Sequence, residues 1–148
     1  MQKKVVPMIH VPDVRRTVDW YRDIGFNVTV AYDDNAGRLS FAMVSFGAGE
    51  VMFSSGGRPS AQHRREVDLY AYTDDVDGLY DRLKDRVEVI EGPHNMFYGM
   101  REVIIRDVNG FWITFGSRPT SSRRGRPSIR RYCSPTQAGT RVTRDLTS

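Results

Sequence analysis

The chain has 148 residues, of which 39% are hydrophobic and 27% are charged, a composition typical of one globular domain. No run approaches the roughly 18 apolar residues of a membrane-spanning helix, and the first residues lack the apolar stretch of a secretory signal. The single cysteine, Cys133, excludes an intramolecular disulfide framework and a cysteine-based zinc site. We therefore expect a cytoplasmic protein with no membrane partner.

Charge divides the chain into two unequal parts. Residues 1–117 hold 14 Lys and Arg against 17 Asp and Glu, a net charge of −3, whereas residues 118–148 hold 8 Arg and one acid, a net charge of +7. The second part has few apolar residues to bury, so we expect a folded domain over 1–117 and a disordered basic tail over 118–148. Within the tail, RRGRP (123–127) has the Arg-Gly-Arg-Pro core of AT-hook peptides. Either the tail makes weak, non-specific contact with nucleic acid, or it is an unselected extension.

The first half of the body predicts a strand, a helix and three further strands. The first strand covers VVPMIHV (5–11), and Asp13 can cap a helix over residues 14–24, whose apolar residues recur at helical spacing. Gly25 stands where the helix is expected to stop. The three strand-like runs that follow are separated by the turn signals DDNAG and GAG and cover residues 26–32, 39–46 and 50–55.

The second half repeats this order of elements. A strand over 67–72 precedes a helix that Asp74 or Asp75 can cap. Val14 and Val76 hold equivalent places in the two helices, 62 residues apart. The three strand-like runs after the second helix cover residues 87–91, 101–106 and 111–116.

The repeat predicts an α+β fold of two tandem βαβββ modules, residues 4–55 and 67–116, joined by the linker GGRPSAQHRRE (56–66). Two such modules side by side give a curved eight-stranded sheet with the helices on its outer face. The inner, concave face at the module junction, called the cup below, is a natural ligand site.

Two stretches resemble the vicinal oxygen chelate superfamily, which includes glyoxalase I, extradiol dioxygenases and bleomycin-resistance proteins. They are VPDVRRTVDWYRDIGF (11–26) and YGMREVIIRDVNGFWITF (98–115). The turn Asp107-Val108-Asn109-Gly110 lacks the proline that this family usually carries there. The resemblance supports the two-module fold and implies a homodimer, whose cups form within one chain or across the dimer by module exchange.

The resemblance also provides a test for a metal. Metal-dependent members of the family place a His or Glu ligand near each of four strand positions, which here are Val6, Met52, Asp68 and Thr114. Only Asp68 is a plausible ligand, and a divalent ion needs about three or four such donors. We therefore expect no metal and no other cofactor. His10, on the same strand face as Val6, is interpreted as a wall or ligand-orienting residue.

Strand alternation divides the sequence into two faces. The face opposite the cup is wholly apolar, as a helix-covered face should be: Val5, Pro7, Ile9, Val51, Phe53, Leu69, Ala71, Ile113 and Phe115. The cup face mixes aromatic, acidic, hydroxyl and methionine side chains: Val6, Met8, His10, Glu50, Met52, Ser54, Asp68, Tyr70, Tyr72, Trp112 and Thr114. This mixture favours a ligand-binding surface. Alternatively, the aromatic residues pack on one another and the acids lie in water at strand ends.

The predicted ligand-binding residues fall into groups by chemistry, and none is predicted to be catalytic. Stacking is assigned to Tyr70, Tyr72 and Trp112, and contacts to cations or donors are assigned to Asp68 and Glu102. Glu102 has an alternative, an ion pair with Arg101 that only holds the loop. The remaining members are the orienting His10, the walls Phe41, Met52 and Phe97, and the hydroxyl of Thr114.

These residues favour a metal-free small-molecule-binding protein that resembles the bleomycin-resistance branch and sequesters a planar or cationic compound. The first alternative is a glyoxalase- or dioxygenase-type enzyme, including a metal-free lyase or isomerase in which His10 or Asp68 acts as a base. The second is a nucleic-acid-associated protein that acts through its tail.

Overall fold

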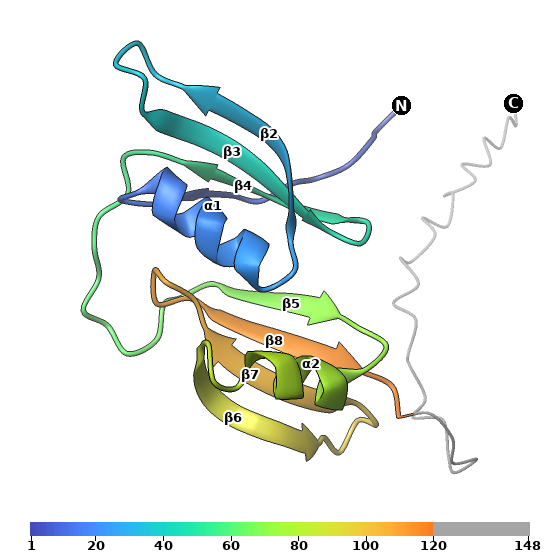
Figure 1. Ribbon diagram of the computed structural model, residues 1–148. Helices are drawn as coiled ribbons and strands as arrows, with labels where there is room; N and C mark the ends of the chain where they lie inside the picture. The colour runs from blue at the N-terminus through green and yellow to red at the C-terminus, as the bar shows by residue number, and fades with distance from the viewer. Residues whose placement is uncertain (120–148) are drawn as a thin grey trace, which may run out of the picture.

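The computed structural model describes residues 1–119, so the predicted disorder of the tail and its AT-hook-like stretch lie outside the described residues. The described part contains two helices and eight strands (Figure 1). Their bounds in chain order are β1 Met8–His10, α1 Val14–Asp23, β2 Asn27–Asp33, β3 Leu39–Phe46, β4 Gly49–Ser54, β5 Asp68–Tyr72, α2 Val76–Leu83, β6 Glu88–Asn95, β7 Arg101–Arg106 and β8 Trp112–Ser117.

The tandem βαβββ repeat is confirmed by the strand topology. The strands pair in the order β1-β4-β3-β2 in one sheet and β5-β8-β7-β6 in the other. In each sheet the first strand of the module runs parallel to the fourth, while the other pairs are antiparallel. The eight expected strands are thus all present, and they hydrogen-bond as two sheets of four.

Both helices begin at an aspartate that caps the first turn. The Asp13 side chain accepts a hydrogen bond from the backbone N–H of Arg16 at 2.9 Å. In the second module Asp75, not Asp74, is the cap, and it accepts from the backbone N–H of Gly78 at 2.9 Å. Each cap satisfies a backbone donor that a helix N-terminus would otherwise leave without a partner.

Helix α1 contacts both modules and joins them into one core. Its Tyr21 is fully buried and donates a hydrogen bond from its hydroxyl to Asp107 Oδ2, at 2.9 Å, in the β7–β8 turn. In the same turn, Asn109 donates from its side-chain amide to the Thr17 hydroxyl at 2.9 Å. Figure 1 shows α1 between the two sheets, and buried residues of both modules form a single cluster.

Strand β1 is shorter than the sequence predicts. Only Met8–His10 forms a strand, and Val5 and Pro7, expected on the buried face, are exposed. Proline has no N–H to donate, so it cannot continue a ladder toward the N-terminus. The expected positions of Val5 and Pro7 are therefore wrong.

Strand β6 is longer than the sequence predicts. It runs to Asn95 through Gly92 and Pro93, with irregular register between Val89 and His94. An edge strand with bulges tolerates a proline, and β6 is the edge of its sheet. His94, beyond the strand-like run 87–91 that the sequence predicts, consequently lies on a strand.

Neither helix within residues 1–119 has the length and apolar character needed to cross a membrane.

Candidate functional site

The register of the second sheet places the predicted acidic and aromatic residues on one face. Asp68 on β5 pairs with Trp112 on β8, and Tyr70 pairs with Thr114 two residues further along. Directly paired residues share a face. On the other face of the two sheets, the side chains of Val51, Phe53, Ile113 and Phe115 are buried, as the alternation predicts.

Glu102 is the most deeply buried acid on the predicted ligand-binding face. It is 4% exposed, and its Oε1 accepts hydrogen bonds from the hydroxyls of both Tyr70 and Tyr98, each at 2.6 Å. The hydrogen bond to Glu102 is the largest cause that raises the pKa of Tyr98 to about 12. Burial is the largest cause of the raised pKa of Tyr70, followed by its hydrogen bond to Glu102. One carboxylate therefore contributes to the raised pKa of two phenols.

Gly116 makes the Tyr70–Glu102 contact possible. Glu102 on β7 lies opposite Gly116 on β8, and Tyr70 comes from β5 on the other side of β8. A Cβ at Gly116 would lie 2.2 Å from the Tyr70 hydroxyl oxygen. Because Gly116 has no side chain, the Tyr70 ring can extend across β8 and reach the Glu102 carboxylate.

Asp68 and Trp112 together hold an arginine from the linker. The guanidinium carbon of Arg64 lies 4.3 Å from the centroid of the Trp112 ring, and its Nη2 forms an ion pair with Asp68. The His63 ring meets Trp112 edge-on, at 6.2 Å between centroids. The linker therefore covers one predicted stacking residue and neutralises one predicted acid.

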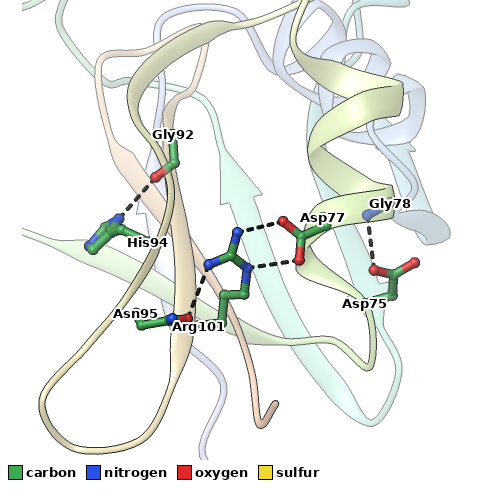
Figure 2. A network of polar contacts seen from close by, with 7 residues as sticks. All are labelled: Asp75, Asp77, Gly78, Gly92, His94, Asn95 and Arg101. Atoms are coloured by element: carbon green, nitrogen blue, oxygen red, sulfur yellow. Dashed lines mark hydrogen bonds and ion pairs between the residues drawn. The ribbon is translucent and has the colours of Figure 1, made fainter. Parts of the chain in front are cut away.

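Arg101 does not pair with Glu102, so that alternative for Glu102 is wrong. Strand alternation sends the two side chains to opposite faces. Arg101 Nε and Nη2 donate to the two carboxylate oxygens of Asp77 at 2.7 and 2.8 Å, and Nη1 donates to Asn95 Oδ1 at 3.0 Å (Figure 2). The hydrogen bonds from Arg101 lower the pKa of Asp77. Arg101 thus fastens the β6–β7 hairpin, next to Glu102, to the start of α2.

The other polar contacts in Figure 2 are local. Asp75 caps α2 through Gly78, and His94 Nδ1 lies 2.9 Å from the carbonyl oxygen of Gly92 within β6. His94 also lies 3.3 Å from Glu91. These contacts are local to β6 and to the start of α2, and His94 itself pairs with Glu102 across β6 and β7.

Three predicted residues lie on the first sheet. His10 on β1 is opposite Ser54, which in turn is opposite Phe41 on β3, while Met52 lies between Met8 and Met43. His10 is exposed, and its Nδ1 lies 3.2 Å from the carbonyl oxygen of Ser55. Within residues 1–119, no hydrogen bond, ion pair or ring contact links this trio to the predicted residues of the second sheet.

The side chains at the four family metal positions do not fit a divalent ion. Val6 and Met52 offer no nitrogen or oxygen donor, and Asp68 is already paired with Arg64. Residues 1–119 contain no cluster of three or more His, Cys, Asp and Glu side chains that could hold a metal. The donor chemistry, rather than any missing ion, argues against a resident metal.

Two clefts lie away from the predicted residues. One, of about 260 Å³, is lined by linker residues together with Val67 and Phe111. The other, of about 190 Å³, lies beside the start of α2 and includes Arg101. Neither contains any of the ten predicted ligand-binding residues. Phe97, one of those ten, is 97% exposed in the β6–β7 turn and meets Tyr98 edge-on.

Sequence reasoning missed Tyr98 and Arg64. Tyr98 reaches Glu102 because the hairpin turns back at Gly99, whose φ is +82°, a conformation that favours glycine. Its signal was the aromatic residue next to a turn glycine, four residues before an acid. Arg64 carried a weaker signal, a basic residue four positions before Asp68.

The sequence model of the Glyoxalase/Bleomycin resistance protein/Dioxygenase superfamily matches residues 5–115, which span both modules. No curated protein sequence matches the chain.

Solved structures share the fold. TioX from Micromonospora sp. ML1 is 22% identical with a TM-score of 0.64, over 79% of this chain and 99% of that chain. The fosfomycin resistance protein FosX from Listeria monocytogenes is 15% identical with a TM-score of 0.64, over 80% of this chain and 94% of that chain. A bleomycin-binding protein in complex with bleomycin is 14% identical with a TM-score of 0.60, over 79% and 99%.

At these identities the structural likeness establishes the fold alone, because one fold hosts many chemistries. The family match, however, covers most of the chain, and the paired βαβββ topology agrees with it. This chain therefore belongs to the glyoxalase/bleomycin resistance protein/dioxygenase superfamily.

Proposed function

We propose that this protein binds a small planar or cationic molecule without a metal and sequesters it, with no bond broken. The observation that carries the proposal is the Glu102 carboxylate, buried on the aromatic face of the second sheet. The hydroxyls of Tyr70 and Tyr98 both donate to its Oε1. No group within residues 1–119 hydrogen-bonds to its Oε2. That oxygen is an acceptor for a cationic or hydrogen-bond-donating ligand.

Flat apolar area next to the carboxylate supports the same proposal. The rings of Tyr70 and Tyr72 lie 5.0 Å apart with a tilt of 53°, and Tyr72 is 75% exposed. Thr114 adds a hydroxyl beside Tyr70, and Phe97 adds an exposed ring at the hairpin turn. A tyrosine buries apolar ligand surface while its hydroxyl still makes polar contacts.

We further propose that two copies of the chain are needed to complete the site. We also propose that the protein acts in the cytoplasm. In one chain the trio His10, Phe41 and Met52 makes no polar or ring contact with the acidic and aromatic residues of the second sheet. A homodimer that pairs the first sheet of one copy with the second sheet of the other would bring the two sets together.

Metal content is the first test of this proposal. The full chain, purified without chelators or a metal-binding tag, is equilibrated with zinc, nickel, manganese and iron(II), desalted and analysed for bound metal. We expect far less than one ion per chain, because the donor set at Val6, Met52, Asp68 and Thr114 does not fit a divalent ion. Near-stoichiometric metal would overturn the metal-free proposal.

Binding and recovery of the ligand form the second test. Bleomycin, the planar cation proflavine and fosfomycin are titrated by calorimetry, and each compound is then recovered and weighed by mass spectrometry. We expect proflavine or bleomycin to bind and to be recovered unchanged. Glu102→Gln should lower the affinity for the cationic compound by about tenfold or more, the usual size of a lost charged hydrogen bond. Asp85→Asn makes an equal charge change at an exposed residue after α2 and should leave that affinity unchanged.

A new product in this assay would support an enzyme of this superfamily instead. No binding of any of the three compounds, or equal binding by Glu102→Gln and Asp85→Asn, would contradict the assigned role of this face.

A further inference from the structure

The linker places a planar cation on two predicted ligand-binding residues. The Arg64 guanidinium lies over the Trp112 ring at 4.3 Å and forms an ion pair with Asp68. Asp68 and Trp112 are direct neighbours across β5 and β8, so the pairing register itself sets a carboxylate beside an indole. An aromatic face with an adjacent carboxylate is the arrangement that recognises a flat, delocalised cation.

The contact is one that a ligand in solution can replace. The side chain of Arg64 is 55% exposed and that of Asp68 is 34% exposed, and cation–π and ion-pair contacts in water are individually weak. The indole N–H of Trp112 is buried and finds no hydrogen-bond partner within residues 1–119. The linker therefore covers the ring without satisfying its polar edge, which is unfavourable for the covered state.

Displacement needs only one side chain to move. The next residue, Arg65, lies 4.5 Å from the centroid of the Phe111 ring and donates to the carbonyl oxygen of Asn109 at 3.3 Å. His63 contacts Arg106 through its carbonyl oxygen and its Nδ1. These two neighbours hold the linker backbone while the Arg64 side chain can swing into water.

We propose that Trp112 and Asp68 form a subsite for a planar guanidinium or amidinium group, and that Arg64 occupies it as an internal competitor. This inference rests on the proposed function and adds two things to it: the chemical class of the group that binds at this end of the face, and the step that admits it. The ligand takes the place of Arg64 on the ring and beside the carboxylate.

The test uses benzamidine, a planar amidinium at neutral pH, and benzamide, its neutral isostere. All variants are made in the full chain with Trp20→Phe, which leaves Trp112 as the single tryptophan. Binding is followed by Trp112 fluorescence and by its indole ¹H–¹⁵N cross-peak. We expect Arg64→Ala to bind benzamidine about tenfold more tightly than the parent, the combined size of one exposed cation–π contact and one exposed ion pair. Benzamide binding should be unchanged.

Arg58→Ala is the matched control, because it removes the same charge from an exposed residue earlier in the same linker. We expect it to change benzamidine affinity by less than about twofold, the scale of a distant surface charge. Asp68→Asn added to Arg64→Ala should abolish the gain.

Equal gains in Arg64→Ala and Arg58→Ala would mean that net charge alone is responsible and would overturn the inference. So would no gain in Arg64→Ala, or an equal gain for benzamide. These results leave the proposed function standing if proflavine or bleomycin still binds in a Glu102-dependent way. If neither proflavine nor bleomycin binds in a Glu102-dependent way, the proposed function is contradicted, whether or not benzamidine binds.

Discussion

At the scale of single residues, one buried acid, Glu102, contributes to the raised pKa of two tyrosines on the aromatic face of the second sheet. Glu102 accepts from two tyrosine hydroxyls at 2.6 Å, and this contact raises the pKa of Tyr98 to about 12. A tyrosine whose folded pKa is above its unfolded value near 10 stabilises the fold fully below pH 10. That contribution is lost as the pH rises from about 10 to about 12.

Replacement of the acid should therefore be visible in the phenol titration. In Glu102→Gln we expect the pKa of Tyr98 to fall back toward its ordinary value, because the hydrogen bond to Glu102 is its largest cause. The pKa of Tyr70 should fall less, since burial is the larger cause there. The measurement is an NMR titration with ring-labelled tyrosine. Glu88→Gln, which removes an acid paired with Arg106 and touches no tyrosine, is the control. Equal titration of Tyr98 in the two variants would contradict this account.

At the scale of elements, the critical junction is between α1 and the β7–β8 turn. The Asp107 side chain is 4% exposed; its Oδ1 accepts from the backbone N–H groups of Asn109 and Phe111 and its Oδ2 from Tyr21. Burial raises the pKa of Asp107 despite these hydrogen bonds. An acid with a raised folded pKa stabilises the protein most at low pH, and this stability is lost as the pH rises through the folded pKa.

Loss of the tyrosine hydroxyl should enlarge that pH dependence. Tyr21→Phe removes one donor from the buried carboxylate, so we expect the free energy of unfolding to fall by about 1–3 kcal/mol at pH 7. The fall should be smaller where Asp107 is protonated in both states, because a neutral acid needs the donor less. Urea unfolding at pH 7 and at about pH 3, below the ordinary pKa of an aspartate, measures this difference. Tyr80→Phe, at a half-buried tyrosine of α2, should cost less. Equal losses at both pH values would show that the Tyr21 hydroxyl acts through packing alone.

At the scale of the whole molecule, the two sheets expose apolar side chains that one chain does not cover. Met8 is 53% exposed on the first sheet, and Tyr70 and Tyr72 are 44% and 75% exposed on the second. Isolated exposed apolar residues are ordinary, but a group of them on uncovered sheet faces indicates a binding surface.

The proposed homodimer gives this surface a partner. Sedimentation of the full chain at micromolar concentration should show a dimer, and Met8→Glu should shift it to monomer because a charge would be buried at the contact. Ala48→Glu, which adds the same charge in the exposed β3–β4 turn, should leave the dimer intact. A monomeric parent, or dissociation by both variants alike, would contradict the assignment.

Much of the architecture could be predicted from local patterns. Asp13 and Gly25 bound α1, and the 62-residue spacing of Val14 and Val76 revealed the repeat. The start of β1 was predicted too early, because VVPMIHV alternates well and the missing N–H of Pro7 was not weighed against that alternation.

The candidate site was predicted unevenly for a similar reason. Glu102 was a candidate only as an acid beside Arg101. Alternation placed Asp68, Tyr70 and Trp112 on one face, because side-chain period is a local property of a strand. It could not place Arg64 on Trp112, since a linker side chain finds its partner through the tertiary fold and carries no periodic signal. Nor could it show that Gly116 makes room for Tyr70, which depends on three neighbouring strands.

The hydrogen bond from Tyr21 to Asp107 joins residues that are 86 positions apart. During synthesis, α1 leaves the ribosome long before the β7–β8 turn that carries Asp107. Until that turn is made, the Tyr21 hydroxyl lacks its partner in the folded protein. Such distant contacts slow folding and prolong the exposure of apolar surface. The nascent first module is therefore the stage at which this chain is most open to chaperones and to misassembly with another unfinished copy.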